Sequence, residues 1–431
     1  MNIQSAKSMA LSSVVLPDDL IAEVLSFLPV IFLLRFRSVS KSWKTLISNP
    51  AFVKLHLKRS ATQNPHFIVI TSYVKHLLGG GIEVDYSVVP YPMSHLIKNP
   101  TETFPLLVDP YYFVSDKECC AIVGTCNGLI CLSGENYNPT DDYIEYWLRL
   151  WNPATRTTSP KFGQFGEFGK TMGPHGMFNF KFGCDDSSGT YKVVAYRYNH
   201  IQLRSVVKII SFGDNVWRDV ESFPVDPLDV DCIWGDYCPD EGVYLSGTLN
   251  WLAIHNSLDY NFEDITVGQF VIVSLDWRME TYNQYKLPRG FDEVPSKRPT
   301  VGVLGGCLCF SYLYVKTDFD FVVWQMKKFG VEESWTQLFK ISYQIPGEWF
   351  NAEDAIKYCQ MVPLLLTENG HVLLKLRIMQ QGYASLYNWS ENREDKIQFT
   401  ASRPITNNNI TREDARLCWA MDYVESLVSI F

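Results

Sequence analysis

The feature that most constrains this chain is a dense apolar pattern in residues 16–57, which read LPDDLIAEVLSFLPVIFLLRFRSVSKSWKTLISNPAFVKLHL. Leu20, Val24 and Leu28 recur at i, i+4 and i+8, and Ile21 and Leu25 form a second apolar stripe beside them. Apolar residues at this period predict a helix whose apolar surface is too wide for one neighbour to cover. Such a helix needs cover on two sides.

Prolines and a capping serine divide the same stretch into three or four predicted short helices. Pro29 ends the first, residues 30–36 form a second, Ser40 is placed to cap a third, and Pro50 opens a final turn. A unit of about 40 residues cannot bury all these leucines against itself, so the surplus apolar surface indicates a protein partner. The alternative is that the bundle packs on the rest of the chain as part of one core.

The stretch also carries a family resemblance. The positions that match, in order and without a gap, are Leu16, Pro17, Leu20, Val24, Leu25, Leu28, Pro29, Leu33, Arg35, Arg37, Val39, Lys41, Trp43, Leu46, Ile47, Pro50 and Phe52. This set resembles the F-box motif in the form usual in plant F-box proteins. The resemblance implies binding to the Skp-type adaptor of a cullin-RING ubiquitin ligase. It implies contacts at Leu16, Pro17, Leu20, Val24, Leu25, Leu28, Pro29 and Leu33, whereas Trp43, Leu46 and Ile47 are either contacts or internal core.

The charge is divided unevenly along the chain. Residues 16–59 carry seven Lys and Arg against three Asp and Glu, a net charge of +4, while the whole chain is at −9, which leaves −13 elsewhere. A nucleic-acid face needs clustered basic side chains, so the acidic remainder argues against a nucleic-acid partner. With 431 residues, 46% of them hydrophobic, the chain is long enough for a small domain and a large one.

The sequence also bears on the compartment and on metals. No apolar run reaches the ~18 residues of a membrane span, and residues 1–13 are expected to be a disordered lead-in without a secretory signal. We therefore expect a protein of the cytoplasm and/or the nucleus whose 11 cysteines are free thiols. Cys119-Cys120 and the Cys307/Cys309 pair lack partners at zinc-site spacing, so no metal or other cofactor is expected.

After His66 the pattern changes to short β-branched and aromatic runs separated by turn residues. A turn glycine followed by an apolar strand recurs in residues 124–133, 246–255, 304–313 and 367–376, with a fifth unit in 191–224 and a sixth in 66–89. This repeat, roughly every 50–65 residues, predicts an all-β, propeller-like domain of about six blades. Residues 417–431 read as a strand that pairs with an early strand and closes the ring; a pair of sheets in a β-sandwich is the alternative.

The predicted organisation is thus α+β by domain: a helical bundle in residues 14–60, followed by the all-β domain in residues 61–431. The segments CNGLICL, LWNPATR and VYLSGTLNWLA, at 126–132, 150–156 and 243–253, resemble the plant F-box-associated domain, which is similar to kelch-type proteins. The resemblance covers about residues 121–341, and residues 60–115 show none. It implies that the β domain recruits a target protein.

No catalytic constellation stands out in the sequence. Gly169-Lys170-Thr171 follows two other glycines, but Gln164 stands where the first glycine of a phosphate loop belongs, and residues 162–168 read as a packed loop. No GxSxG or HExxH pattern occurs, and the eight histidines are scattered. We therefore expect a protein that is not an enzyme.

Two features of the β domain bear on target binding. Trp217, Trp251, Trp277, Trp324 and Trp335 recur near strand ends, which favours packing between blades, with an aromatic binding face as the alternative. Binding residues concentrate in loops, and the candidate loops are 226–240, 255–266 and 291–299. Their candidate residues are Trp234, Asp236, Tyr237, Tyr260, Phe262 and Phe291. The first two loops are acidic and aromatic, which favours a basic or mixed-charge partner surface.

The function expected from the sequence is substrate recognition in a Skp-cullin-F-box ubiquitin ligase, with the bundle docked on the adaptor and the β domain holding a target protein. Two alternatives remain open. One is an F-box scaffold that does not direct degradation, and the other is a glycan-binding propeller in which the helices are incidental packing.

Overall fold

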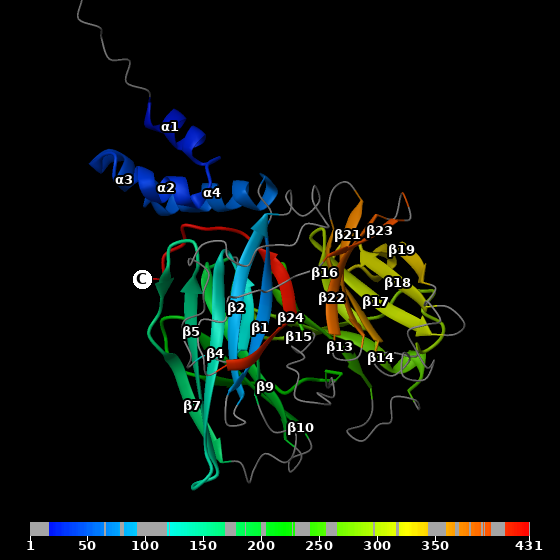
Figure 1. Cartoon of the computed structure of the whole chain (residues 1–431). Coiled ribbons are helices and arrows are strands. Elements are labelled where there is room, and N and C mark those ends of the chain that lie inside the picture. The colour runs from blue at the N-terminus through cyan, green and yellow to red at the C-terminus, as the bar shows by residue number, and fades with distance from the viewer. Residues whose placement is uncertain are drawn as a thin grey trace, which may run out of the picture.

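The structure is a computed structural model of the whole chain. It describes residues 17–63, 66–77, 82–92, 119, 121–168, 178–185, 187–199, 204–225, 227–228, 242–255, 265–295, 298–315, 319–343, 359–366, 370–378, 381–388, 391, 393–397 and 410–430. Four helices lie at one end of a larger β domain (Figure 1).

The helices are α1 (Asp18–Leu25), α2 (Val30–Phe36), α3 (Lys41–Ile47) and α4 (Pro50–Gln63). Ser40 caps α3 as predicted, because its Oγ accepts a hydrogen bond from the backbone N–H of Trp43 at 3.1 Å. Helix α1 ends at Leu25, short of Pro29, which instead directly precedes α2. The predicted final turn is a 14-residue helix, α4, and it carries the helical part of the chain to Gln63.

The described strands form six antiparallel sheets. Five of them take their strands in chain order. They comprise β3 (Ala121–Cys126), β4 (Leu129–Asn138), β5 (Tyr143–Asn152) and β6 (Thr157–Thr158), with β7 (Phe162–Phe168) also on β5; β8 (Asn179–Asp185), β9 (Thr190–Asn199), β10 (Arg204–Ser211) and β11 (Arg218–Val220); β12 (Val243–Leu245), β13 (Thr248–Ile254), β14 (Phe270–Asp276) and β15 (Tyr282–Tyr285); β16 (Thr300–Leu304), β17 (Cys307–Val315), β18 (Phe319–Met326) and β19 (Trp335–Tyr343); and β20 (Cys359–Leu366), β21 (His371–Ile378), β22 (Gln381–Asn388) and β23 (Arg393–Ile397).

The sixth sheet joins the two ends of the β domain. Its order is β2-β1-β24, made of β1 (His66–Leu77), β2 (Ile82–Pro92) and β24 (Ile410–Tyr423). Strand β24 runs antiparallel to β1 along almost its whole length, from His66 opposite Tyr423 to Leu77 opposite Ile410. The predicted sixth unit and the predicted pairing of a late strand with an early one are both confirmed. The strand predicted in residues 417–431 ends earlier than expected: β24 stops at Tyr423, and residues 424–430 leave the sheet.

The six sheets are arranged in a ring. The first strands β3, β8, β12, β16 and β20, together with β24, each contact the next: β3 meets β8, β12 meets β16, β16 meets β20, β20 meets β24, and β24 meets β3. Strand β12 is tied to β8 by a hydrogen bond from the Tyr244 hydroxyl to the Cys184 carbonyl. Radial sheets in a closed circle are the architecture of a β-propeller, so the β-sandwich alternative is wrong.

The repeating turn glycines lie between the first and second strand of a sheet. Asn127 and Gly128, Ser246 and Gly247, and Gly305 and Gly306 all have positive φ, as do Gly189 and Gly370 in the other two sheets. The first three turns are two-residue hairpins with positive φ at both central positions, a geometry that matches the twist of the flanking strands and favours glycine. Gly189 and Gly370 stand at the ends of longer turns.

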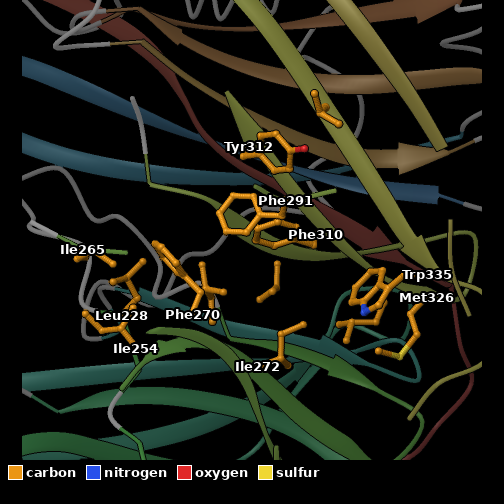
Figure 2. Packing of buried hydrophobic residues seen from close by; sticks show 14 of the residues in the cluster. Leu228, Ile254, Ile265, Phe270, Ile272, Phe291, Phe310, Tyr312, Met326 and Trp335 are labelled. Atoms are coloured by element: carbon orange, nitrogen blue, oxygen red, sulfur yellow. The ribbon is translucent and has the colours of Figure 1, made fainter. Parts of the chain in front are cut away.

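Apolar side chains fill the space between neighbouring sheets. Trp251 and Trp277 are buried between the β8–β11 and β12–β15 sheets, and Trp335 is buried between the β12–β15 and β16–β19 sheets (Figure 2 shows the second cluster). Trp217 and Trp324 are half-buried against similar clusters. The expected role of the tryptophans in packing between blades is confirmed.

Residues 162–168 correct one expectation. They form strand β7 on β5 instead of a packed loop. Gly163, with a φ of +61°, accepts a hydrogen bond at its carbonyl from Trp217 Nε1 at 2.7 Å. This strand was not predicted because glycine has a low strand propensity, and the segment contains two glycines. Glycine within a strand often marks a close approach of another group, as at Gly163.

Candidate adaptor-binding surface

The four helices pack around a small apolar core. Leu25, Val30, Leu33, Ile47 and Phe52 are buried and pack together. Leu25 comes from α1, Val30 and Leu33 from α2, Ile47 from α3 and Phe52 from α4, so every helix contributes. Apolar residues from all four helices are therefore buried inside the bundle.

A second apolar set of the bundle faces outward. Leu20 is 54% exposed, Val24 66%, Phe27 46%, Phe32 44% and Val39 63%. We call these five residues the exposed apolar set. They are five of the nine large hydrophobic residues exposed in the described part of the chain, although they all lie within 20 consecutive residues. Such a concentration of exposed apolar side chains marks an interaction surface.

The exposed set follows from the geometry of α1. Leu20 and Val24 are one helical turn apart and share a face, while Leu25 lies on the opposite, buried side. Figure 1 shows α1 as the helix farthest from the β domain, with α2, α3 and α4 between them. The wide apolar surface predicted for this helix is therefore divided between a face buried in the bundle core and a face exposed to solvent.

The structure divides the eleven predicted adaptor contacts into groups. Pro17, Leu20 and Val24 are exposed; Leu28, Pro29, Trp43 and Leu46 are half-buried; Leu25, Leu33 and Ile47 are buried in the bundle core; and Leu16 lies outside the described residues. The Trp43 ring packs edge-on against Phe36, with ring centroids 5.4 Å apart. A partner can reach the three buried side chains only if the bundle opens.

Sequence reasoning missed Phe27, Phe32 and Val39 as surface residues. Phe27 lies three residues after Val24, so continuing the Leu20–Val24 face by i+3 would have found it. Val39 is one of the positions that match the motif, and it precedes the Ser40 cap and is not helical.

Cationic side chains accompany the exposed phenylalanines. The Arg59 guanidinium lies 4.3 Å from the centre of the Phe27 ring, and Arg35 lies 5.9 Å from that of Phe32. Arg59 also pairs with Glu23 and donates hydrogen bonds to the Glu23 carbonyl and to Ser26 Oγ. These contacts hold Phe27 on a positively charged surface, in agreement with the local charge of the sequence.

A buried histidine lies beneath this surface. His56 is fully buried, and its Nε2 donates a hydrogen bond to the Leu28 carbonyl at 2.9 Å. Burial lowers the His56 pKa below 6.5, against the opposing influence of the Leu28 carbonyl and the Glu425 carboxylate. The ring therefore stays neutral at neutral pH and acts as a tie between α4 and the turn after α1.

The predicted target-binding residues fare differently. Trp234, Asp236, Tyr237, Tyr260 and Phe262 lie outside the described residues. Phe291 is only 3% exposed, and its ring packs edge-on against Phe270 and Phe310, with centroids 5.6 Å and 5.0 Å away (Figure 2). Phe291 is a core residue and not a surface contact, because its loop folds back over the gap between two sheets.

The described residues offer little for catalysis or metal binding. Within them, no group of three or more His, Cys, Asp or Glu side chains is placed to hold a metal ion. Cys131, Cys184 and Cys309 are buried, and burial raises the pKa of the Cys309 thiol to about 12, so it is a packed thiol. Among the helices of the described residues, none has the length and apolarity to cross a membrane.

Comparison with known proteins places this arrangement in a family. Residues 15–55 match the F-box domain, and residues 93–430 match the F-box associated beta propeller domain. Similar proteins of Arabidopsis thaliana include F-box/kelch-repeat protein At3g23880, 28% identical over 96% of this chain and 95% of its own length, and F-box protein CPR1, 26% identical over 76% of this chain and 73% of its own length.

Among solved structures, the beta-propeller domain of the Trilobed protease from Pyrococcus furiosus is 9% identical, with a TM-score of 0.34 over 65% of this chain and 71% of its own. A likeness this low says nothing about function. The family match, in contrast, covers most of the chain and both of its parts. The chain belongs to the F-box proteins that carry an F-box associated beta propeller domain.

Proposed function

We propose that this chain is the substrate-recognition subunit of a Skp-cullin-F-box ubiquitin ligase. The exposed apolar set of the bundle carries the proposal, because it offers a Skp-type adaptor a surface that the chain itself leaves uncovered. The chain is then a non-catalytic subunit. It raises the effective concentration of a target lysine near the conjugating enzyme, and other subunits perform the transfer.

The magnitudes support docking through this surface. Full burial of one exposed Val or Leu side chain is worth about 1.5–3 kcal/mol. Leu20 is 54% exposed and Val24 66% exposed, so burying what remains can contribute roughly 2–4 kcal/mol to adaptor binding. The charged rim formed by Arg35 and Arg59 contributes less energy, and it favours a partner with an acidic surface around an apolar centre.

The β domain supplies the other half of the proposed function. A closed ring of sheets is a rigid support from which loops present side chains to a target protein. We keep loops 226–240 and 255–266 as the candidate target contacts, with a basic or mixed-charge partner surface. Adaptor and ligase are proteins of the cytoplasm and the nucleus, and we expect the chain to work there.

Proximity labelling in plant cells, with and without a proteasome inhibitor, tests the function as a whole. The three chains to compare are the wild type, Leu20→Ser/Val24→Ser, and the control Val216→Ser/Met279→Ser, which changes two exposed apolar residues of the β domain. We expect the wild type and the control to label the adaptor, and to label target proteins mainly when the proteasome is inhibited. The bundle variant should lose the adaptor and label the targets without inhibitor.

Two results would contradict the proposal. One is a wild-type chain that labels no Skp-type adaptor. The other is a wild-type chain that labels the adaptor but no protein whose labelling rises on proteasome inhibition, which is the result expected of a scaffold that does not direct degradation.

A further inference from the structure

The chain has an unusual path after its last strand. Residues 424–430 leave the closing sheet at the end of β24 and run between the helices and the β3–β6 sheet, where Figure 1 shows them in red. Ser426, Leu427 and Ile430 are 0%, 3% and 4% exposed. An irregular segment that is this deeply buried needs partners for its backbone.

The β domain provides these partners. Asn152, itself fully buried, donates hydrogen bonds from Nδ2 to the carbonyls of Ser426 at 3.1 Å and Val428 at 2.9 Å. The Val428 N–H donates to Ser426 Oγ at 2.8 Å. Gly128, at φ +79°, lies so close that a Cβ there would be 2.3 Å from the Ser426 Cβ. Segment 424–430 is thus held against the end of β5 and the turn between β3 and β4, and it approaches that turn so closely that only a glycine fits there.

The side chains of the segment reach into two different cores. Leu427 belongs to the core of the helical bundle, with Leu25, Leu33 and Ile47, and Ala154 joins this cluster from the β domain. Ile430 belongs to the core between the β3–β6 and β8–β11 sheets. One short segment therefore packs into the bundle and into the ring at the same time.

We propose that segment 424–430 is the seat that fixes the F-box bundle in one orientation on the β domain, with Leu427 and Asn152 as its positioning residues. The bundle is also attached covalently, where α4 leads into β1, so the seat adds a second attachment at a different point. If the chain has the proposed function, the seat also holds the bound adaptor in one orientation relative to the target-binding face. Transfer that depends on proximity requires such a fixed orientation.

A set of full-length variants tests the seat without any adaptor. Leu427→Asn puts a polar group into the bundle core, Leu427→Met keeps an apolar group there, and Met279→Ser changes an exposed residue of the β domain. Spin labels attached through non-natural residues at Ser42 and Ser187, both exposed, report the distance between α3 and the β domain. Hydrogen exchange of α2 and α3 reports the stability of the bundle.

We expect narrow distance distributions for the wild type, Leu427→Met and Met279→Ser. Leu427→Asn should broaden the distribution and speed exchange in α2 and α3 by about tenfold or more, because it weakens the bundle core and its attachment together. Exchange in β13 and β14 should stay unchanged. An unaltered distance distribution in Leu427→Asn would overturn the proposal.

Asn152→Asp provides a second, independent test in case Leu427→Asn unfolds the bundle. It replaces the Nδ2 donor with an oxygen facing two carbonyls, so it releases segment 424–430 while all the bundle residues stay in place. The proposal predicts a broadened distribution here too, and it is wrong if Asn152→Asp behaves as the wild type.

The affinity for a purified Skp-type adaptor separates this inference from the proposed function. Met279→Ser and Asn152→Asp leave the exposed apolar set intact, so both should bind the adaptor like the wild type. If the wild type fails to bind, the proposed function is wrong while the distance measurements still decide the seat. If binding is normal and the distances do not respond, only the seat is wrong.

Discussion

At the scale of single residues, neighbouring positions with the same chemistry have opposite roles. Val24 and Leu25 are adjacent in α1, yet Val24 is 66% exposed and Leu25 is 3% exposed. A helix turns by about 100° per residue, so one of them meets the bundle core and the other meets solvent. The resemblance to the motif predicts both residues as adaptor contacts. The structure shows that Val24 can be replaced without disturbing the bundle core, whereas Leu25 cannot.

His56 gives a prediction on pH dependence. Its folded-state pKa lies below the value of 6.5 for an ordinary histidine, so between the two values the unfolded chain binds the proton that the folded chain excludes. The histidine's contribution to stability is therefore complete above about pH 6.5 and is lost as the pH falls toward the folded pKa. We expect the urea midpoint to drop between about pH 7.5 and pH 5.5 in the wild type.

His56→Gln is the control for this prediction. A glutamine amide can still donate to the Leu28 carbonyl but does not titrate, so the drop in the urea midpoint should be smaller in the variant. Equal drops in the two proteins would mean that the acid sensitivity comes from other groups.

A pair of glycines isolates the contact with segment 424–430. Gly128 has a φ of +79° and Gly189 a φ of +72°, but a Cβ at Gly189 meets nothing within 4 Å, while one at Gly128 meets the Val424 carbonyl at 2.6 Å. Gly189→Ala should cost roughly 1 kcal/mol of unfolding free energy through backbone strain alone. Gly128→Ala should cost distinctly more, measured by urea denaturation. Similar losses of unfolding free energy in the two variants would show that the contact between Gly128 and segment 424–430 does not affect stability.

At the scale of elements, the repeat of turn glycines was the most informative part of the sequence. It predicted the first hairpin of four sheets, those with turns at Gly128, Gly247, Gly306 and Gly370, because a tight hairpin turn favours positive φ. The unit in residues 191–224 was predicted without its first hairpin, whose turn holds Gly189. The glycine-rich strand β7 and the full length of α4 were not predicted, since glycines in one and polar residues such as Lys54 and Arg59 in the other obscure the periodic pattern. Residues 424–430 were predicted to be part of a strand. Their actual path depends on a hydrogen bond to Asn152, which lies 274 residues from Ser426 in the sequence, so local sequence could not predict it.

Trp251 tests the packing between two of these elements. It is 1% exposed, packs edge-on against Tyr196 and Phe223, and donates from Nε1 to the Tyr196 hydroxyl at 3.0 Å. Trp251→Ala should lower the free energy of unfolding by about 3–5 kcal/mol, and Trp251→Phe by less, because it keeps much of the ring volume. A loss below about 1 kcal/mol in the alanine variant would contradict a packing role.

At the scale of the whole molecule, the ring is closed by strands from its two ends, and the bundle is attached next to this closure. The number of sheets and the pairing of β24 with β1 were predictable, because each unit needs neighbours to bury its apolar faces. The target-binding face was not, because recognition depends on how loop side chains are arranged in space, and a single sequence does not show that arrangement. Of the candidate site, the sequence predicted the bundle surface, and the structure reduced it to the side chains that a partner can touch.

The measurement that tests the central claim most directly is the affinity of the purified full-length chain for a purified Skp-type adaptor. The variant is Leu20→Ser/Val24→Ser, and the control is Met279→Ser, at a residue that is 66% exposed, as Val24 is. The variant lacks two apolar side chains that adaptor binding would bury, so its affinity should fall by roughly a hundredfold or more, while the control binds like the wild type. If the variant binds within about threefold of the wild type while its bundle stays folded, the exposed apolar set is not the adaptor-binding surface.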